Sequence, residues 1–239
     1  MTPAEFSDGF DQLVNSYSRF KSFDNRETFD SIEFDEYQKS LFLTKAQEEL
    51  VLHLYDGKNI YGESFELTEE LRRYLSSLVK EATLSSVDDS GTTGMGNSKF
   101  FHLPEDLWFI TYEQVEVSDA QCEGASILDV IPITQDEYHK VKRNPFRGAN
   151  MRRALRLDLS NNIVEIVSKQ TVSSYYIRYM KELKPIILRN LPDGLTIKGL
   201  SNITPCELHE GLHYRILEEG VRMALQSKSI GTSKNINRE

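Results

Sequence analysis

The chain has 239 residues, of which 39% are hydrophobic and 10% aromatic, a composition that excludes an intrinsically disordered protein. No apolar run approaches the roughly 18 residues of a membrane-spanning helix, and residues 1–8 lack a secretion signal. The two cysteines, Cys122 and Cys206, are too few for a disulfide framework. We therefore expect neither membrane association nor export. The formal net charge of −9 argues against a general nucleic-acid binder, but it conceals an acidic part, residues 1–137 with 28 acidic and 10 basic side chains, and a basic part, residues 138–200 with 4 acidic and 13 basic.

Three amphipathic helices are predicted in the first third of the chain. The first begins at a capping box formed by Thr2 and Glu5, and apolar residues follow at helical spacing. A second helix is predicted over residues 35–55 and a third over residues 68–79. Because their apolar stripes need one another, we expect residues 1–84 to form an N-terminal helical bundle.

The sequence pattern changes from helix to strand in the middle of the chain. Residues 85–98 have almost nothing to bury, and no Gly-Lys-Ser/Thr follows their glycines, so a flexible loop is expected rather than a phosphate-binding loop. Residues 99–203 contain short segments rich in β-branched and aromatic residues, which predict an antiparallel β-rich domain. Its clearest hairpin spans residues 155–167 and turns at Ser160-Asn161-Asn162, and a short helix is predicted over residues 134–143.

A last helix is predicted over residues 204–228, starting at Thr204-Pro205, and residues 229–239 are expected to be a flexible tail. Because this helix follows the β-rich stretch, we expect it to return to the N-terminal helices. The predicted fold is therefore α+β: a helical bundle formed by the N-terminal helices and the C-terminal helix, with an inserted antiparallel β-rich domain.

The predicted last helix contains His209-Glu-Gly-Leu-His213, which as a bare pattern is the zinc-hydrolase signature, and Cys206 would add a third ligand one turn earlier. On a helical projection, however, His209 and His213 lie on the apolar side while Glu210 points to the polar side. We therefore expect packing histidines, no catalytic residue, no metal and no cofactor. A zinc-dependent hydrolase using His209, Glu210 and His213 stays open as an alternative, as does a metal site at Cys206, His209 and His213.

A basic cluster supplies the candidate contact residues, which are Lys140, Lys142, Arg143, Arg147, Arg152, Arg153 and Arg156. Only Tyr138 and Phe146 are interleaved aromatics, so base stacking on single strands is not indicated. Duplex phosphates and an acidic protein neighbour would both suit such a cluster. We favour the protein neighbour because the acidic part of the chain supplies such a surface, and a DNA-binding regulatory protein stays an alternative.

Several segments resemble the neck ring proteins of crAss-like tailed phages, and they are Leu43–Leu50, Leu103–Trp108, Val130–Lys140, Asn144–Arg147, Tyr176–Leu188 and Cys206–His209. The arrangement of the chain is also similar to that of the tail adaptor (tail tubular A) proteins of short-tailed phages. The resemblance covers most of residues 35–228. It rests on the order of the segments and on their local sequence similarity, and it includes no catalytic motif.

The resemblance implies a structural virion protein without enzymatic activity. Such a protein would be a subunit of a head-tail connector (neck) ring, a homo-oligomer of twelve copies that joins the portal to the tail and contacts other neck ring proteins. Genomic double-stranded DNA would pass through its lumen. The protein would be made in the cytoplasm of the bacterial host and located in the virion. The family offers no catalytic residues to carry over to this chain.

Overall fold

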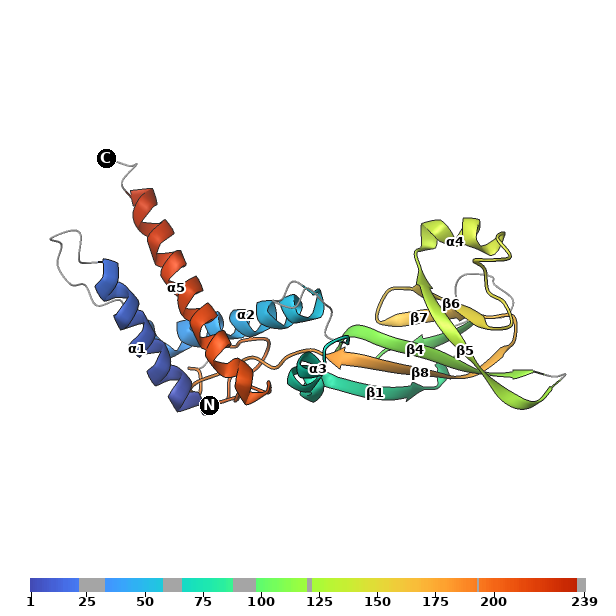
Figure 1. Ribbon diagram of the computed structural model, residues 1–239, viewed down its shortest axis with the longest axis horizontal. Coiled ribbons are helices and arrows are strands. Elements are labelled where there is room, and N and C mark those ends of the chain that lie inside the picture. The colour runs from blue at the N-terminus through green and yellow to red at the C-terminus, as the bar shows by residue number, and fades with distance from the viewer. Residues whose placement is uncertain (22–32, 58–65, 88–97, 120–121, 193, 236–239) are drawn as a thin grey trace. The chain divides into compact units, whose positions relative to one another are not determined.

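The computed structural model describes residues 1–21, 33–57, 66–87, 98–119, 122–192 and 194–235. The chain divides into two compact units (Figure 1). One comprises Met1–Leu78 together with Leu183–Glu239, and the other comprises Val79–Glu182. In the part of the chain that is described, no helix is both long and apolar enough to cross a membrane.

The first unit is helical. Its helices are α1 (Pro3–Lys21), α2 (Glu36–Tyr55), α3 (Glu69–Leu75) and α5 (His213–Asn235), and short 3-10 turns follow α3 (η1, Ser76–Leu78) and precede α5 (η2, Glu210–Leu212). The predicted capping box at the start of α1 is confirmed, because Glu5 N–H donates to Thr2 Oγ1 at 3.3 Å and Thr2 N–H donates to Glu5 Oε2 at 2.8 Å.

Two glycines let the helices of this unit approach closely. A Cβ on Gly9 of α1 would lie 2.9 Å from a methyl carbon of Leu217, and one on Gly220 of α5 would lie 3.2 Å from Leu43 of α2. The core around these crossings is apolar and almost fully buried, and it includes Phe6, Phe10, Val14, Leu43, Ala46, Val51, Leu54, Leu212, Ile216, Leu217, Val221 and Ala224. Helix α5 therefore packs against both α1 and α2.

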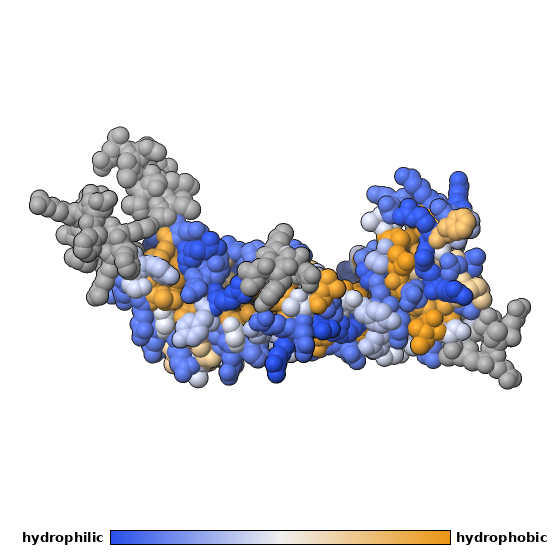
Figure 2. Space-filling view, viewed as in Figure 1, coloured by the Kyte–Doolittle hydropathy of each residue, from blue (hydrophilic) through white to orange (hydrophobic). Residues whose placement is uncertain are grey.

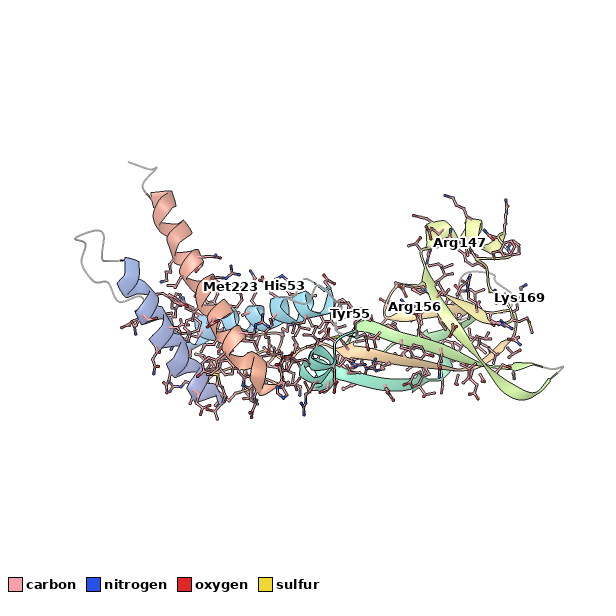
Figure 3. The ribbon with its side chains drawn as sticks, viewed as in Figure 1. His53, Tyr55, Arg147, Arg156, Lys169 and Met223 are labelled. Atoms are coloured by element: carbon pink, nitrogen blue, oxygen red, sulfur yellow. The ribbon has the colours of Figure 1, made fainter. Side chains whose placement is uncertain are left out.

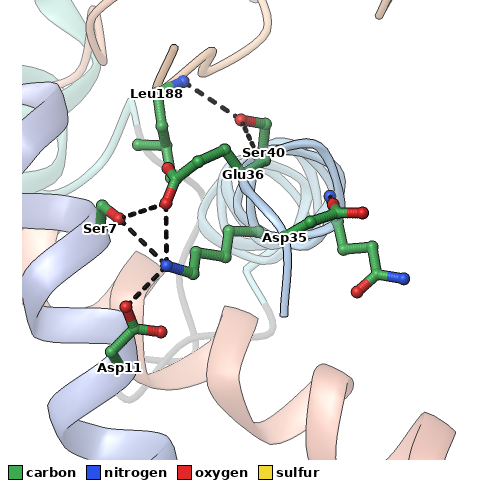
Figure 4. Close-up of polar contacts among 8 residues, drawn as sticks. Ser7, Asp11, Asp35, Glu36, Ser40 and Leu188 are labelled. Carbon is green, nitrogen blue, oxygen red and sulfur yellow. Dashed lines mark hydrogen bonds and ion pairs between the residues drawn. The ribbon is translucent and has the colours of Figure 1, made fainter. Parts of the chain in front are cut away.

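The buried face of α2 is partly polar, which the predicted apolar stripe did not anticipate. Ser40 Oγ accepts from Leu188 N–H at 3.1 Å, Thr44 Oγ1 accepts from Ile186 N–H at 3.1 Å, and Gln47 Nε2 donates to Lys184 O at 2.6 Å. These bonds satisfy an irregular backbone segment that lies against the helix, and Figure 4 shows the one between Ser40 and Leu188. Leu41, an apolar residue of the same helix that was expected to help form its apolar stripe, is 40% exposed.

The second unit is a single eight-stranded sheet. Its strands are β1 (Val79–Leu84), β2 (Ser86–Val87), β3 (Ser98–His102), β4 (Leu107–Asp119), β5 (Cys122–Ile133), β6 (Arg153–Asp158), β7 (Ile163–Val167) and β8 (Thr171–Lys181), in the order β1-β8-β4-β5-β6-β7-β3-β2. The sheet curls over on itself. The evidence is that the rings of Phe101 on β3 and Tyr175 on β8 lie 5.3 Å apart although four strands separate β8 from β3. The curl encloses an apolar core.

The sheet is mixed rather than purely antiparallel, which corrects the predicted fold in one respect. Strands β5 and β6 pair in parallel, from Asp129 opposite Arg153 to Ile133 opposite Leu157. A parallel pair needs a crossover connection, and the predicted short helix, α4 (Gln135–Lys142), supplies it. The β6–β7 hairpin is confirmed, with Asn161 and Asn162 at φ of 60° and 56° in its turn.

Residues 79–84, which the prediction placed at the end of the third helix and of the helical bundle, form strand β1 of the sheet. Helix α3 stops at Leu75, and Ala82 and Leu84 face inward on a strand whose backbone pairs with β8, from Val79 opposite Met180 to Leu84 opposite Tyr175. Most of the predicted loop, residues 88–97, lies outside the described residues, while its ends belong to β2 and β3.

The last helix also differs from the prediction at both ends. Thr204 does not begin it, because the Thr204 N–H and C=O groups are both bonded to Ile187 in an isolated bridge. The backbone becomes helical only at Glu210, and α5 then runs to Asn235, past the predicted end at residue 228. Residues 183–203, which the predicted boundaries placed with the β-rich domain, fall within the helical unit.

Candidate interaction surface

Residues 135–153, here called the α4 projection, stand on the outer face of the curled sheet (Figure 1). Tyr138 and Val141 of α4 are buried against Leu155 and Leu157 of β6. The inner face of the same strand contributes Ala154 to the main core. Strand β6 therefore has apolar residues on both faces, and the contacts of its outer face with α4 form a second, smaller core that holds the helix to the sheet.

The loop that follows α4 is a tightly bonded turn that presents Phe146 outward. Asn144 O accepts from Gly148 N–H at 2.8 Å, and Asn144 Oδ1 accepts from Phe146 N–H at 2.9 Å. A Cβ on Gly148 would lie only 3.0 Å from Asn144 O, so the turn requires glycine there. The Arg153 guanidinium donates to Phe146 O at 3.0 Å. Phe146 itself is 86% exposed.

The structure brings most of the predicted basic residues together on this projection. Between residues 135 and 153 there are six basic and two acidic side chains. The exposed ones are Lys140, Lys142, Arg143, Arg147 and Arg152, whereas Arg153 is partly buried. Figure 3 shows Arg147 on the projection and Arg156 in the sheet beneath it. Figure 2 shows hydrophobic residues reaching the surface beside this hydrophilic cover.

Arg156 is held inside the curled sheet, unlike the other candidates. Its guanidinium donates to Glu113 Oε2 at 2.8 Å and to Asp158 Oδ1 at 2.9 Å, and its side chain is only 11% exposed. Tyr175 OH donates to the same Glu113 oxygen at 2.6 Å. Burial raises the pKa of Glu113, and the attraction of Arg156 and the bond from Tyr175 oppose that rise. We attribute a structural role to Arg156.

The pentapeptide histidines do not converge on one point. His209 is exposed, and its Nδ1 accepts from Gly211 N–H at 3.1 Å. His213 is buried, with Nδ1 2.7 Å from the Met1 amino group and Nε2 3.0 Å from Leu208 O. The first of them precedes the 3-10 turn, so the pair lacks the regular helical spacing that a zinc site would use.

Cys206 does not join the histidines either. Its Sγ lies 3.9 Å from Gln47 Oε1, and burial raises the pKa of the thiol to about 11. Over the described ranges of the chain, no group of three or more His, Cys, Asp and Glu side chains is arranged to hold a metal ion. The bonds of His213 and His209 are those of packing and capping residues.

A groove that the sequence did not reveal lies along α2 in the helical unit. Its volume is about 560 Å³, and it is lined by Phe34, Gln38, Leu41, Phe42, Thr44, Lys45, Glu48, Thr196, Ile197, Lys198, Ser227 and Lys228. The Phe34 ring lies edge-on to Phe10 and Phe42, with centroids 5.7 and 5.9 Å away. Because the lining comes from three distant stretches of the chain, no local spacing could have predicted it.

An acidic surface lies where α1 meets the start of α2. Lys39 Nζ lies 2.7 Å from Asp11 Oδ2, 2.9 Å from Glu36 Oε1 and 3.1 Å from Ser7 Oγ (Figure 4). The lysine side chain is only 5% exposed, whereas those of Asp11 and Glu36 are 49% and 33% exposed. Carboxylates therefore dominate the outer surface, and the compensating ammonium lies beneath them.

Comparison with known proteins matches residues 1–236 to the family described as phage tail ring protein 3/4. The chain is 45% identical over 233 residues to "Ring protein 3" of Bacteroides phage crAss001, covering 96% of this chain and 97% of the relative. It is also 29% identical over 235 residues to "Ring protein 4/5" of the same phage, covering 94% and 92% of the two chains.

Proposed function

Since the chain belongs to the phage tail ring protein 3/4 family, whose members are structural proteins of the virion, we propose that it is a subunit of a head-tail connector (neck) ring. In this proposal the ring joins the portal to the tail, lies beside other neck ring proteins, and forms part of the conduit for genomic double-stranded DNA. The subunit acts by assembly, as a tail adaptor that holds the path of DNA ejection, and not by catalysis.

The observation that carries the proposal is the full-length similarity to Ring protein 3, which spans both the helical unit and the curled sheet. Identical subunits close into a ring through heterologous contacts, in which one surface of each copy meets a different surface of the next. A homo-oligomer of twelve copies is the proposed state. We further propose that α1, α2 and α5 act as one helical bundle, since α5 packs on both of the others.

The α4 projection is the proposed contact surface of the subunit. Lys140, Lys142, Arg143, Arg147 and Arg152 are exposed on it, and they suit an acidic protein neighbour or the phosphates of DNA. The same exposure supports a second candidate function, DNA binding in the absence of a ring. That alternative predicts a duplex complex that weakens steeply with salt and is lost when Arg147 and Arg152 are both replaced by alanine.

Native mass spectrometry of the purified protein, alone and mixed with its portal protein, tests the ring. We expect a closed oligomer, with about twelve copies, in at least one of the two samples. A protein that is strictly monomeric and also does not bind the portal would refute the connector role. A gel shift with duplex DNA at two salt concentrations, run on the same preparation, separates DNA binding from ring assembly.

A further inference from the structure

We propose that the α4 projection of one copy docks on the outer face of strands β4, β5 and β8 in a second copy of this chain. This inference rests on the proposed function, because it names the contact between neighbouring subunits of the ring. Figure 1 shows α4 over β6 and β7, on a different part of the sheet from β4 and β8. The contact is therefore heterologous, so repeated copies can close into a ring.

The projection carries the features of a protein anchor. Phe146 is 86% exposed and Met151 is 56% exposed, and both stand among arginines and lysines. Aromatic side chains and arginines are the residues that most often dominate protein interfaces. Because Asn144, Gly148 and Arg153 fix the turn, Phe146 loses little freedom on docking.

The receiving surface, here called the tyrosine face, is the outer side of three neighbouring strands. Val115 of β4, Leu128 of β5 and Tyr175 of β8 belong to the core inside the curl, so the residues that alternate with them point outward. The outward residues that the argument uses are Tyr112, Glu116, Ile127, Asp129, Ile131 and Tyr176.

The tyrosine face offers exposed apolar and aromatic groups to Phe146 and to arginines. Ile127 is 65% exposed, Tyr112 46% and Ile131 37%. The rings of Tyr112 and Tyr176 have centroids 6.4 Å apart, and Ile127 lies opposite Glu116 in the pairing of β4 with β5. Apolar, aromatic and acidic side chains therefore lie within one small area. Tyrosine rings pack with other aromatic rings at their edges and accept guanidinium groups on their faces.

Negative charge predominates on the tyrosine face. Residues 107–134, which include β4 and β5, contain five acidic and no basic side chains. Glu116 and Asp129 are two of these and are exposed on the face, and the exposed Glu81 of β1 adds a third carboxylate. One arginine, Arg178 of β8, lies opposite Glu81. Three outward carboxylates thus stand against one guanidinium.

The projection has the opposite charge. Its six basic side chains outnumber its two acidic ones, and Lys140, Arg143, Arg147 and Arg152 are exposed. Complementary exposed charges of this kind steer docking and fix its orientation. Contacts to DNA phosphates would use the same cations but would not require the exposed Phe146. The combination favours a protein surface that is both acidic and apolar, which the tyrosine face is.

Photocrosslinking tests the contact directly. Phe146 is replaced by p-benzoylphenylalanine, and this protein is mixed with an equal amount of ¹⁵N-labelled wild-type protein, with and without the portal protein, before illumination. We expect crosslinks from position 146 to residues 110–116, 126–131 or 174–178 that carry the isotope, which identifies them as residues of another copy. Crosslinks to another region, to the portal alone or only within one chain, or none at all, would overturn the inference.

A charge-swap experiment tests the orientation. Arg147→Glu with Arg152→Glu reverses the charge of the projection, and Glu116→Lys with Asp129→Lys reverses that of the tyrosine face. Each double variant alone should associate with itself at least about tenfold more weakly than wild type in sedimentation velocity. An equal mixture of the two should recover association, because each reversed surface then meets a partner of opposite charge. A mixture that associates no better than either variant alone would contradict the pairing.

Each double variant has a control with the same change in net charge. Arg189→Glu with Arg215→Glu reverses two exposed arginines of the helical unit. Glu105→Lys with Glu182→Lys reverses two exposed carboxylates that lie just outside the ends of β4 and β8. Both controls should associate as wild type, and controls that weaken association as much as the variants would show an effect of net charge and refute the contact.

The outcomes separate this inference from the ring itself. If wild-type protein forms rings while the crosslinks lie elsewhere or the variants behave like their controls, the inference is refuted and the connector role stands. If the expected crosslinks form between copies but no ring is found with or without the portal, the contact stands and the connector role fails. If the projection variant loses only duplex binding in a gel shift, the projection is a DNA contact and the inference is overturned.

Discussion

Replacing Lys39 by methionine should destabilise the helical unit, because this lysine joins α1 to α2 from a buried position. Its ammonium makes three bonds, to Asp11, Glu36 and Ser7, at 2.7 to 3.1 Å. Burial disfavours the charged lysine, but the bonds and charges of Asp11 and Glu36 outweigh that effect and raise the pKa of Lys39. Methionine keeps the apolar stem and removes the charge.

The expected loss is about 2 kcal/mol. A hydrogen bond to a charged group contributes about 1.5 to 3 kcal/mol, but Asp11 and Glu36 are 49% and 33% exposed, so water replaces much of what they lose. For a chain of this size that loss corresponds to a fall in Tm of about 4 to 8 °C. Because the pKa of Lys39 is raised, its contribution is complete below the ordinary lysine pKa of about 10.4 and disappears as the pH rises through the higher folded value.

Urea unfolding followed by circular dichroism at 222 nm measures the change, since most of the helix is in this unit. Lys45→Met on the same helix is the matched control, because Lys45 is 66% exposed and 3.9 Å from Glu49, and it should cost less than about 0.5 kcal/mol. Equal, small effects of the two substitutions would refute the assignment of Lys39 as the structural link.

Two further predictions concern other buried groups. Arg156→Leu should lower the free energy of unfolding by about 3 to 5 kcal/mol, because it leaves Glu113 buried without its cation. The double variant with Glu113→Gln should recover part of that loss in chemical unfolding. Equal losses for the single and double variants would contradict the pairing. Burial lowers the pKa of His213, so the stability that neutral His213 contributes is complete above about pH 6.5 and is lost as the pH falls toward the lower folded value. Thermal midpoints at pH 7.5 and 5.5 should therefore differ more for wild type than for His213→Gln, and identical differences would exclude His213 as the source.

The elements that local chemistry determines could be predicted from the sequence. The capping box of Thr2 and Glu5, the cap and length of α2, and the asparagine turn of the β6–β7 hairpin depend on residues a few positions apart. Strand β1 is not predicted because Val79 continues the apolar spacing of Leu75 and Leu78, which fits a helix, and only pairing with β8 decides between helix and strand.

The candidate site divides in the same way. The basic residues of the α4 projection are neighbours in sequence, so their cluster was visible there. The exposure of Phe146 and the burial of Arg156 depend on tertiary contacts that no spacing shows. The His209 to His213 pattern misleads because Thr204 is bonded to Ile187, which delays the helix and removes the regular spacing of the two imidazoles.

The pairing of Val79 with Met180 has a consequence for how this chain can be rebuilt. Strands β1 and β8 are the first and last of the curled sheet along the sequence, and they lie side by side, so residues 79–182 enter and leave at nearly the same point. A segment whose two ends are adjacent can be inserted, exchanged or lost without opening the unit that surrounds it. Residues 79–182 can therefore be altered or replaced as one piece, because they join the rest of the chain at a single place.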